Sequence, residues 1–240
     1  MCNNNFIKVI IDMIIMKDIH KKYPNGVTAL SGISINIEKG EFVYIVGPSG
    51  AGKSTFIRLM YREVAASEGE LLIDGVELSK LKDKEIPLIR RQIGVIFQDF
   101  KLLSKLSVYE NIAFALEVIE ESPQKIRKRV MEVLDLVGLK NKSRSLPNEL
   151  SGGEQQRVSI ARAIVNNPKI VIADEPTGNL DPETSWEIMR IFEEINFRGT
   201  TVIMATHSKE IVNTIKKRVI AIENGLIVRD ESRGDYGYEI

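Results

Sequence analysis

The stretch Gly47-Pro-Ser-Gly-Ala-Gly-Lys-Ser-Thr55 constrains the fold of this 240-residue chain more than any other feature. It matches the phosphate-loop pattern G-x-x-x-x-G-K-[ST], and it lies between a short apolar run, Phe42 to Val46, and a helical pattern. Glycines let backbone N–H groups close around phosphates, and the start of the following helix adds favourable partial charge. The dinucleotide pattern G-x-G-x-x-G is excluded, because Ser49 stands where it needs glycine. We therefore predict a phosphate-binding loop between a buried strand and a helix.

This loop also predicts the ligands. Lys53 is expected to reach the β- and γ-phosphates of ATP, and the Ser54 hydroxyl is expected to hold Mg²⁺. ATP and Mg²⁺ are therefore the predicted cofactors. The predicted nucleotide contacts in the loop are Gly47, Pro48, Ser49, Gly50, Ala51, Gly52, Lys53, Ser54 and Thr55.

Apolar runs elsewhere in the chain predict further strands. Ile33, Ile35 and Ile37 alternate with polar residues, which is typical of a strand with one buried face. Continuous apolar runs that alternate with helical patterns indicate a mostly parallel sheet covered on both faces. These runs are Phe42–Val46, Ile93–Phe97, Ile170–Ala173, Thr201–Ala205 and Val219–Glu223.

Between Asp99 and Val165 the pattern is helical almost throughout. We expect one helix over Val108–Ile119, a second that opens at Pro123, and a third over Glu154–Val165. This stretch, at about 99–165, is interpreted as a helical lobe inserted in the α/β core.

Two acids follow one of the predicted strands. Asp174 and Glu175 come directly after Ile170–Ala173, so both carboxylates should emerge at the carboxyl edge of the sheet, where ligands of such folds bind. Beside a phosphate loop, Asp174 is expected to hold Mg²⁺ through water. Glu175 is expected to orient and polarise the attacking water. Two loop acids after a core strand, without a ligand, are the alternative.

The stretch Leu150-Ser-Gly-Gly-Glu-Gln-Gln156 is a second glycine motif. Ser151 fits the N-cap of a helix, and with Gly152 and Gly153 it would form an anion-binding helix N-terminus. The alternative is a plain helix start, in which Ser151 serves only as the N-cap. At this point the sequence resembles the ABC ATPase superfamily, whose signature is this stretch. The resemblance implies that Ser151, Gly152 and Gly153 contact the γ-phosphate of ATP held by a partner's phosphate loop, and hence a homodimer in the ATP-bound state.

The same resemblance implies four further site residues. Tyr23 stands where the family stacks an aromatic ring on adenine, although a core or surface tyrosine is an alternative. Gln98 matches the glutamine that touches Mg²⁺ or water and senses the position of the helical lobe. Asp181 matches an acid that crosses the dimer interface, and with Pro182 behind it Asp181 also fits a helix N-cap. His207 matches the histidine that contacts the γ-phosphate, so Glu175, His207 and Gln98 are the predicted catalytic residues.

The resemblance also implies the fold class: an α/β P-loop NTPase with a mostly parallel core, an N-terminal antiparallel β subdomain and the inserted helical lobe. We expect an irregular leader over residues 1–12 and the ATPase domain over 13–240. The polar tail from Glu231 to Ile240 is expected to be loosely held.

Composition excludes several classes. Lysine plus arginine equal aspartate plus glutamate at 33 each, so a nucleic-acid-binding domain is not expected. The one cysteine, Cys2, gives no disulfide framework and favours a reducing compartment. Phe6–Met16 is apolar but too short to span a bilayer, and no other segment is long enough, so a membrane role would require a partner.

The short separation of Gln98 from Ser151 leaves no room for the coiled-coil arm of DNA-repair and chromosome-organising ATPases, and a single cassette argues against translation-associated ABC proteins.

Three segments narrow the resemblance to the FtsE family of cell-division ATPases: Gln98–Leu103, Tyr109–Val118 and Asp181–Ile188, together with the ending Arg229–Tyr238. That family implies an FtsX-like integral membrane partner, an indirect action on peptidoglycan hydrolases, and a position on the cytoplasmic face of the cell membrane. It further implies that exposed apolar residues near Gln98, such as Phe100 and Leu103, receive a cytoplasmic element of the partner. The alternative is the ATPase of a lipoprotein-releasing or peptide-exporting ABC transporter, because these share the blocks around Ser151 and Asp174.

Overall fold

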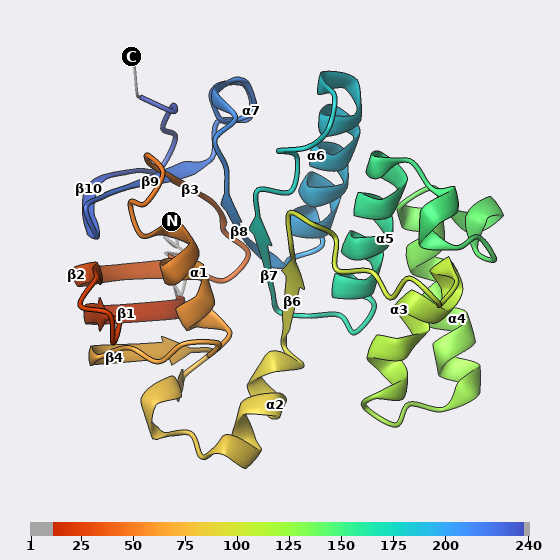
Figure 1. The fold of residues 1–240 in the computed structure, drawn as a ribbon, viewed down its shortest axis with the longest axis horizontal. Coiled ribbons are helices and arrows are strands. Elements are labelled where there is room, and N and C mark those ends of the chain that lie inside the picture. Colours follow the sequence, from red (N-terminus) through yellow and green to blue (C-terminus); the bar gives the residue numbers. More distant parts are fainter. Residues whose placement is uncertain (1–11, 238–240) are drawn as a thin grey trace, which may run out of the picture.

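The computed structural model describes residues 12–237 and builds them into two sheets accompanied by helices (Figure 1). The smaller sheet is antiparallel, with the strand order β2-β1-β4-β5. Its strands are β1 (Asp12–Lys22), β2 (Thr28–Glu38), β4 (Glu68–Ile73) and β5 (Val76–Glu77). An N-terminal antiparallel subdomain is therefore confirmed.

The larger sheet has six strands in the order β10-β9-β3-β8-β7-β6. Neighbouring strands from β9 to β6 pair in parallel, and only β10 is antiparallel to its neighbour. Its strands are β3 (Phe42–Val46), β6 (Ile93–Ile96), β7 (Ile170–Asp174), β8 (Thr201–Ala205), β9 (Arg218–Glu223) and β10 (Leu226–Glu231). The expected mostly parallel core is confirmed, with bounds within a residue of those predicted.

Helices fill the space between the sheets and cover the far side of the larger one (Figure 1). Three of them, α3 to α5, form one group at the side of the larger sheet and lie between β6 and β7 in the chain. The α-helices are α1 (Lys53–Met60), α2 (Ile86–Arg90), α3 (Val108–Glu117), α4 (Pro123–Leu136), α5 (Gly152–Ile164), α6 (Pro182–Phe197) and α7 (Lys209–Thr214). The helix predicted to open at Pro123 does so, with proline in its first turn.

Strand β3 separates two hydrophobic cores. Phe42, Tyr44 and Val46 face the core shared with α3 to α6, whereas Val43 and Ile45 face the core shared with the antiparallel sheet and α1. Because every side chain of β3 is buried, the strand needs a continuous apolar run, as the sequence predicted. The phosphate loop is thus attached to a strand that is buried along its whole length.

The parallel strands bring their following residues to one edge of the larger sheet. The phosphate loop follows β3, Gln98 lies two residues after β6, Glu175 follows β7, and His207 lies two residues after β8. Parallel strands that neighbour one another end on the same side, so these residues meet although they are far apart in sequence.

The C-terminal segment departs from its prediction at Tyr236. The tail from Glu231 to Ile240 is predicted to be loosely held, yet Tyr236 is only 6% exposed. Residues 238–240 of that tail lie outside the described residues. Its backbone N–H donates to Asn213 Oδ1 at 2.7 Å, and the Arg229 guanidinium donates to the carbonyls of Asp235 and Tyr236 at 2.7 and 2.9 Å. The prediction is wrong for Tyr236 because a polar sequence does not require solvation: here Asn213 and Arg229 supply the backbone partners of the tail.

At the other end of the chain, β1 begins at Asp12, one residue inside the expected leader. The rest of that expected leader, residues 1–11, lies outside the described residues. Among residues 12–237, no helix combines the length and the apolar character that a membrane crossing requires.

Asn111 organises the irregular segment between Gln98 and α3. This residue is fully buried, and its Oδ1 accepts from the N–H of Leu103 at 2.8 Å. Its Nδ2 donates to the carbonyls of Leu103, Leu106 and Ser107 at 3.1, 2.9 and 3.0 Å. One side chain therefore binds four backbone groups of the turn that leads into α3.

Replacing Asn111 with alanine should lower the free energy of unfolding by about 2–3 kcal/mol, because buried backbone groups lose their partners. Urea denaturation at equilibrium measures this change. Asn141→Ala is the matched control, since Asn141 is exposed and should change stability by less than about 0.5 kcal/mol. Equal stabilities for the two variants would contradict the role given to Asn111.

Candidate functional site

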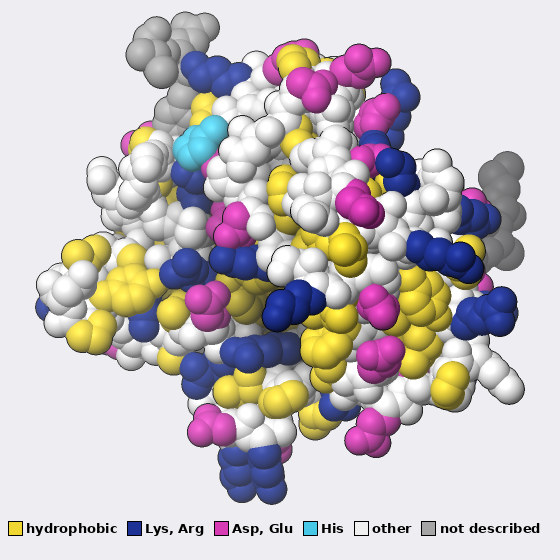
Figure 2. Space-filling model, turned by 45° about the vertical axis from the view of Figure 1, so that its right-hand side comes forward, with side chains coloured by type: hydrophobic (Ala, Val, Ile, Leu, Met, Phe, Trp, Pro, Cys, Tyr) yellow, Lys and Arg dark blue, Asp and Glu magenta, His cyan; other side chains and the backbone are white. Residues whose placement is uncertain are grey.

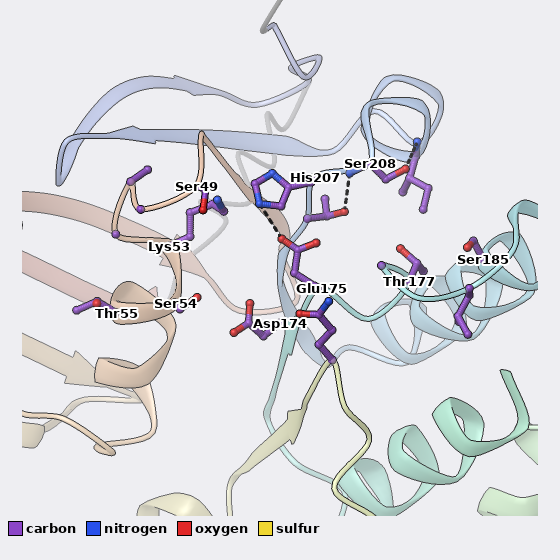
Figure 3. Close-up of a pocket in the computed structure, with 18 of the residues that line it drawn as sticks. Ser49, Lys53, Ser54, Thr55, Asp174, Glu175, Thr177, Ser185, His207 and Ser208 are labelled. Carbon is purple, nitrogen blue, oxygen red and sulfur yellow. Dashed lines mark hydrogen bonds and ion pairs between the residues drawn. The ribbon is translucent and has the colours of Figure 1, made fainter. Parts of the chain in front are cut away.

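The predicted site residues line a cleft of about 790 Å³ at the carboxyl edge of the larger sheet. The phosphate loop forms one wall, Asp174, Glu175 and His207 lie opposite, and Thr177 and Ser185 close the far end (Figure 3). The predicted residues that line the cleft are Tyr23, Ser49, Gly50, Ala51, Gly52, Lys53, Ser54, Thr55, Gln98, Asp174, Glu175 and His207. The chain thus gathers residues from five separate segments into one concave site.

The phosphate loop is shaped by a glycine that nothing else could replace. Gly47 has a φ of 144°, and a Cβ there would lie 2.1 Å from the carbonyl oxygen of Ile222 on β9. Position 47 must therefore be glycine, because the loop passes directly against the neighbouring strand where it leaves β3. This close approach sets the direction in which the loop turns into α1.

Lys53 is the buried cation of the cleft, at 7% exposure. Its Nζ donates to the carbonyls of Gly47 and Pro48 at 2.8 and 2.9 Å, so the loop holds its own lysine. Burial lowers the pKa of Lys53, while the nearby charges of Glu175 and Asp174 raise it. The ammonium is thus pre-positioned in the loop, where phosphate oxygens are stronger acceptors than carbonyls.

The two acids face this cation from the end of β7. Burial raises the pKa of Asp174 and of Glu175 above their ordinary values. The charge of Arg58, a hydrogen bond from Ser54 and the charge of Lys53 partly offset the shift in the Asp174 pKa. The charges of His207 and Lys53 partly offset that of the Glu175 pKa. A half-buried carboxylate with a raised pKa is a better proton acceptor than an exposed one, which suits a general base.

Glu175 is held in an unusual conformation. Its φ is 51°, in the left-handed region that non-glycine residues rarely adopt, and its N–H donates to the carbonyl of Ala205 at 3.0 Å. Its carboxylate pairs with His207, whose Nε2 lies 3.1 Å from Oε1. Backbone and side chain are therefore both fixed, and strain of this kind is found at functional sites.

Gln98 and Glu175 meet over Gly178. A Cβ built on Gly178 would lie 3.4 Å from Gln98 Nε2 and 3.6 Å from Glu175 Oε2. The exposed Gln98 side chain thus lies beside Glu175 at the segment that leads to the helical group. Its contact with Mg²⁺ or water stays a prediction.

Tyr23 lies at the outer end of the cleft. Its hydroxyl is 3.2 Å from Thr55 Oγ1, and the ammonium of Lys21 lies 5.0 Å from the centre of its ring. Tyr23 is half-buried and lines the cleft, so it is not a core residue. Its stacking on adenine stays a prediction.

The second glycine motif lies outside this cleft. Ser151 caps α5: its Oγ accepts from the N–H of Glu154 at 3.2 Å, and Glu154 Oε2 accepts from the N–H of Ser151 at 2.9 Å. Ser151 and Gly152 are exposed, and neither they nor Gly153 and Asp181 line the cleft. The chain therefore separates its two predicted anion sites.

The starts of α5 and α6 pack directly on one another. A Cβ on Gly153 would lie 2.3 Å from Thr184 Cγ2, so only glycine permits this contact. Asp181 caps α6, with Oδ1 accepting from the N–H of Thr184 at 2.9 Å and Pro182 in the first turn, as predicted. Ser151 and Asp181 are therefore placed on one exposed surface.

Sequence reasoning missed several residues of the site. Among them, Thr177, Ser185 and Trp186 line the cleft, and Tyr236 contacts His207 with its hydroxyl 3.3 Å from Nδ1. The proximity of the first three to Glu175 and Asp181 in the chain was a usable signal. Tyr236 gave no signal, because its contact depends on how the tail folds back.

Comparison with known proteins identifies the relatives of this chain. A family model described as ABC transporter matches residues 30–178. The cell division ATP-binding protein FtsE of Bacillus subtilis is 71% identical over 225 residues, which are 94% of this chain and 99% of that protein. The protein of the same name from Streptococcus pneumoniae is 66% identical over 227 residues, which are 95% of this chain and 99% of that protein.

Among solved structures, the ATP-binding cassette MJ0796 in a dimeric post-hydrolysis state bound to ADP and Pi superposes with a TM-score of 0.84. It is 38% identical to this chain, and the match covers 92% of this chain and 99% of that one. The fold and the enzyme class are thereby shown: an ABC cassette that hydrolyses ATP.

Neutralising Asp174 and neutralising Asp181 should change the melting temperature in opposite directions. Because burial raises the pKa of Asp174, the ionised group destabilises the folded state, and wild-type stability falls as pH rises through that pKa. Asp174→Asn should therefore raise the melting temperature of the nucleotide-free protein at pH 7, and the gain should disappear in acid.

Asp181→Asn is the control, for which we expect a change in melting temperature of the opposite sign. Hydrogen bonds from Thr184 lower the pKa of Asp181, so the ionised group stabilises the fold, and this contribution is lost as pH falls through the lowered pKa. Its melting temperature should drop at pH 7. Thermal scans from about pH 2 to 8 measure both, and a destabilised Asp174→Asn variant at neutral pH would contradict the argument.

Proposed function

Because this chain belongs to the ABC transporter family and, within it, to the FtsE proteins of cell division, we propose that it couples ATP-driven dimerisation to a membrane partner of the FtsX type. Two copies bind two ATP molecules head to tail. Each nucleotide is held by the phosphate loop of one copy and the Ser151 helix start of the other. The protein lies on the cytoplasmic face of the membrane through its partner, and the pair controls peptidoglycan hydrolases.

The separation of the two anion sites is the observation that supports the proposed dimer. One chain supplies Lys53, Glu175 and His207 in one cleft, while Ser151 lies outside that cleft on an exposed surface. The first N–H groups of α5 and its partial positive charge suit a phosphate group. The site becomes complete when a second copy brings its Ser151 to the first copy's cleft.

The residues of the cleft divide the work of hydrolysis. Lys53 binds the β- and γ-phosphates, Tyr23 stacks on adenine, and Glu175 orients the attacking water and accepts its proton. His207 holds the carboxylate of Glu175 and contacts the γ-phosphate. Asp181, beside Ser151, contacts the other copy.

Mg²⁺ fits the donors at the base of the cleft. Ser54 and Asp174 offer a hydroxyl and a carboxylate in mutual contact, and Gln98 offers an amide oxygen from the opposite side; these are the oxygen ligands that Mg²⁺ prefers. Among the described residues no group of three or more histidine, cysteine, aspartate or glutamate side chains could hold a metal alone. The ion would therefore be held jointly with the phosphates, whose charge it neutralises.

The segment after Gln98 is suited to connect the cleft with the partner. Phe100 and Lys101 have φ values of 60° and 50°, and their carbonyls accept from the Arg162 guanidinium at 2.9 and 2.7 Å. Arg162 lies in the last turn of α5, the helix that Ser151 begins. A displacement of this segment would therefore move both Gln98 and the helix that carries Ser151.

The helical group also carries exposed apolar side chains. The side of the molecule formed by the helical group shows hydrophobic side chains between charged ones (Figure 2). The exposed large hydrophobics of that region are Leu103, Phe114, Val118, Met131 and Leu146. Together with the half-buried Phe100, Leu103 is proposed to receive a cytoplasmic element of the membrane partner.

Glu175→Gln should leave ATP binding intact and reduce hydrolysis by at least about 100-fold, because the amide does not accept the proton of the attacking water. An ATP-bound dimer should accumulate. Phosphate release measures hydrolysis, and size-exclusion chromatography with ATP measures the dimer. Glu117→Gln, an exposed change on α3, is the control and should behave as wild type. Wild-type hydrolysis in Glu175→Gln would refute the proposed role.

Substituting Phe100→Asn together with Leu103→Ser should abolish co-purification with the membrane partner and leave the ATPase rate of the isolated chain within about twofold. Asparagine tolerates the left-handed backbone at position 100, so the fold is retained. The control is Phe197→Ser, which removes an 88% exposed side chain at the end of α6. The placement fails if the double variant still co-purifies as wild type does.

A further inference from the structure

The C-terminal segment enters the hydrolytic site through Tyr236. The two nitrogens of the His207 imidazole have different partners: Nε2 lies 3.1 Å from Glu175 Oε1, and Nδ1 lies 3.3 Å from the Tyr236 hydroxyl. The imidazole thus bridges the predicted general base and a residue that stands only a few positions before the end of the chain.

The hydroxyl is held in place by the anchoring of the tail. The backbone of Tyr236 is fixed by Asn213 and Arg229, and the ammonium of Lys209 lies 5.9 Å from its ring. Asn213 and Lys209 belong to α7, and Arg229 belongs to β10. A side chain that two separate elements fix presents its hydroxyl at a defined position, so little ordering remains to be done when the reaction occurs.

The arrangement determines which nitrogen of His207 carries the proton. Nε2 faces a carboxylate oxygen, so it must be protonated in order to donate to Glu175. In the neutral imidazole Nδ1 then has a free lone pair, which accepts from the Tyr236 hydroxyl. Burial and the charge of Glu175 raise the pKa of Tyr236, so the hydroxyl keeps the proton that it donates.

Resting on the proposed function, we propose that Tyr236 is a positioning residue for ATP hydrolysis. Its hydroxyl holds His207 in the tautomer that donates from Nε2 to Glu175, and the C-terminal segment is therefore part of the hydrolytic machinery. Tyr236 acts through His207 and does not itself contact the reacting atoms.

Tyr236→Phe tests this assignment because it removes only the hydroxyl. We expect kcat for ATP hydrolysis to fall by about 3- to 10-fold, the range expected from the loss of one neutral hydrogen bond, with the KM for ATP unchanged. Tyr44→Phe is the matched control: it removes the hydroxyl of another buried tyrosine, which has no hydrogen-bond partner among the described residues and lies outside the cleft. A raised KM with an unchanged kcat, or an equal loss of kcat in Tyr44→Phe, would overturn the proposal.

Nitrogen NMR of the histidines supplies a readout that does not depend on activity. The chain has two histidines, so the spectrum of protein labelled with ¹⁵N-histidine contains two imidazoles, and His20 serves as the internal reference. Tyr236→Phe should raise the Nδ1-protonated fraction of His207 and leave His20 unchanged. An unchanged His207 tautomer would overturn the proposal.

Failure of the wild-type chain to hydrolyse ATP would instead contradict the proposed function. The tautomer measurement would still decide the role of Tyr236 in that case, because it requires no turnover.

Discussion

The parallel pairing of β3 with β8 and β9 is the constraint on which the rest of the structure depends. This ladder fixes where β3 ends, and Gly47 then turns against the carbonyl of Ile222 on β9. Because β7 pairs with β8 in parallel as well, Asp174 ends level with Ala205, and both acids face the phosphate loop. The chemistry of the cleft is thus a result of strand register, and the two cores on either side of β3 hold that register.

The local sequence pattern was sufficient to predict the strands whose side chains are buried in a regular pattern. The all-buried run of β3 and the alternation of Ile33, Ile35 and Ile37 are direct consequences of how sheets bury side chains, so the sequence predicted both strands and, for β3, its bounds. The convergence of Lys53, Glu175 and His207 could be predicted too, because each follows a strand of one parallel sheet.

Contacts between distant segments could not be predicted in the same way. The position of Tyr236 depends on an amide oxygen on α7 and a guanidinium on β10, and neither has a pattern that marks it as a partner of the tail. The packing of Gly153 on Thr184 is similar: a second glycine after Ser151 suggested a phosphate contact, whereas the structure also shows a steric reason for it. Pairings of this kind arise from the tertiary fold, which a linear pattern does not contain.

The cleft concentrates features that oppose folding. Glu175 has a left-handed backbone, burial raises the pKa of both acids, and the segment after Gln98 contains two further left-handed residues. Such backbone strain costs of order 1–3 kcal/mol a residue and persists only where the surroundings impose it. Here the surroundings are the β7–β8 pairing and the bonds from Arg162. In the function proposed above, a site under this strain has its charged groups in place before nucleotide arrives, so the binding energy of ATP is available to bring two copies together. In the same proposal Arg162 would transmit the movement of one copy against the other to the cleft, because it joins the helix that Ser151 begins to the segment that carries Gln98.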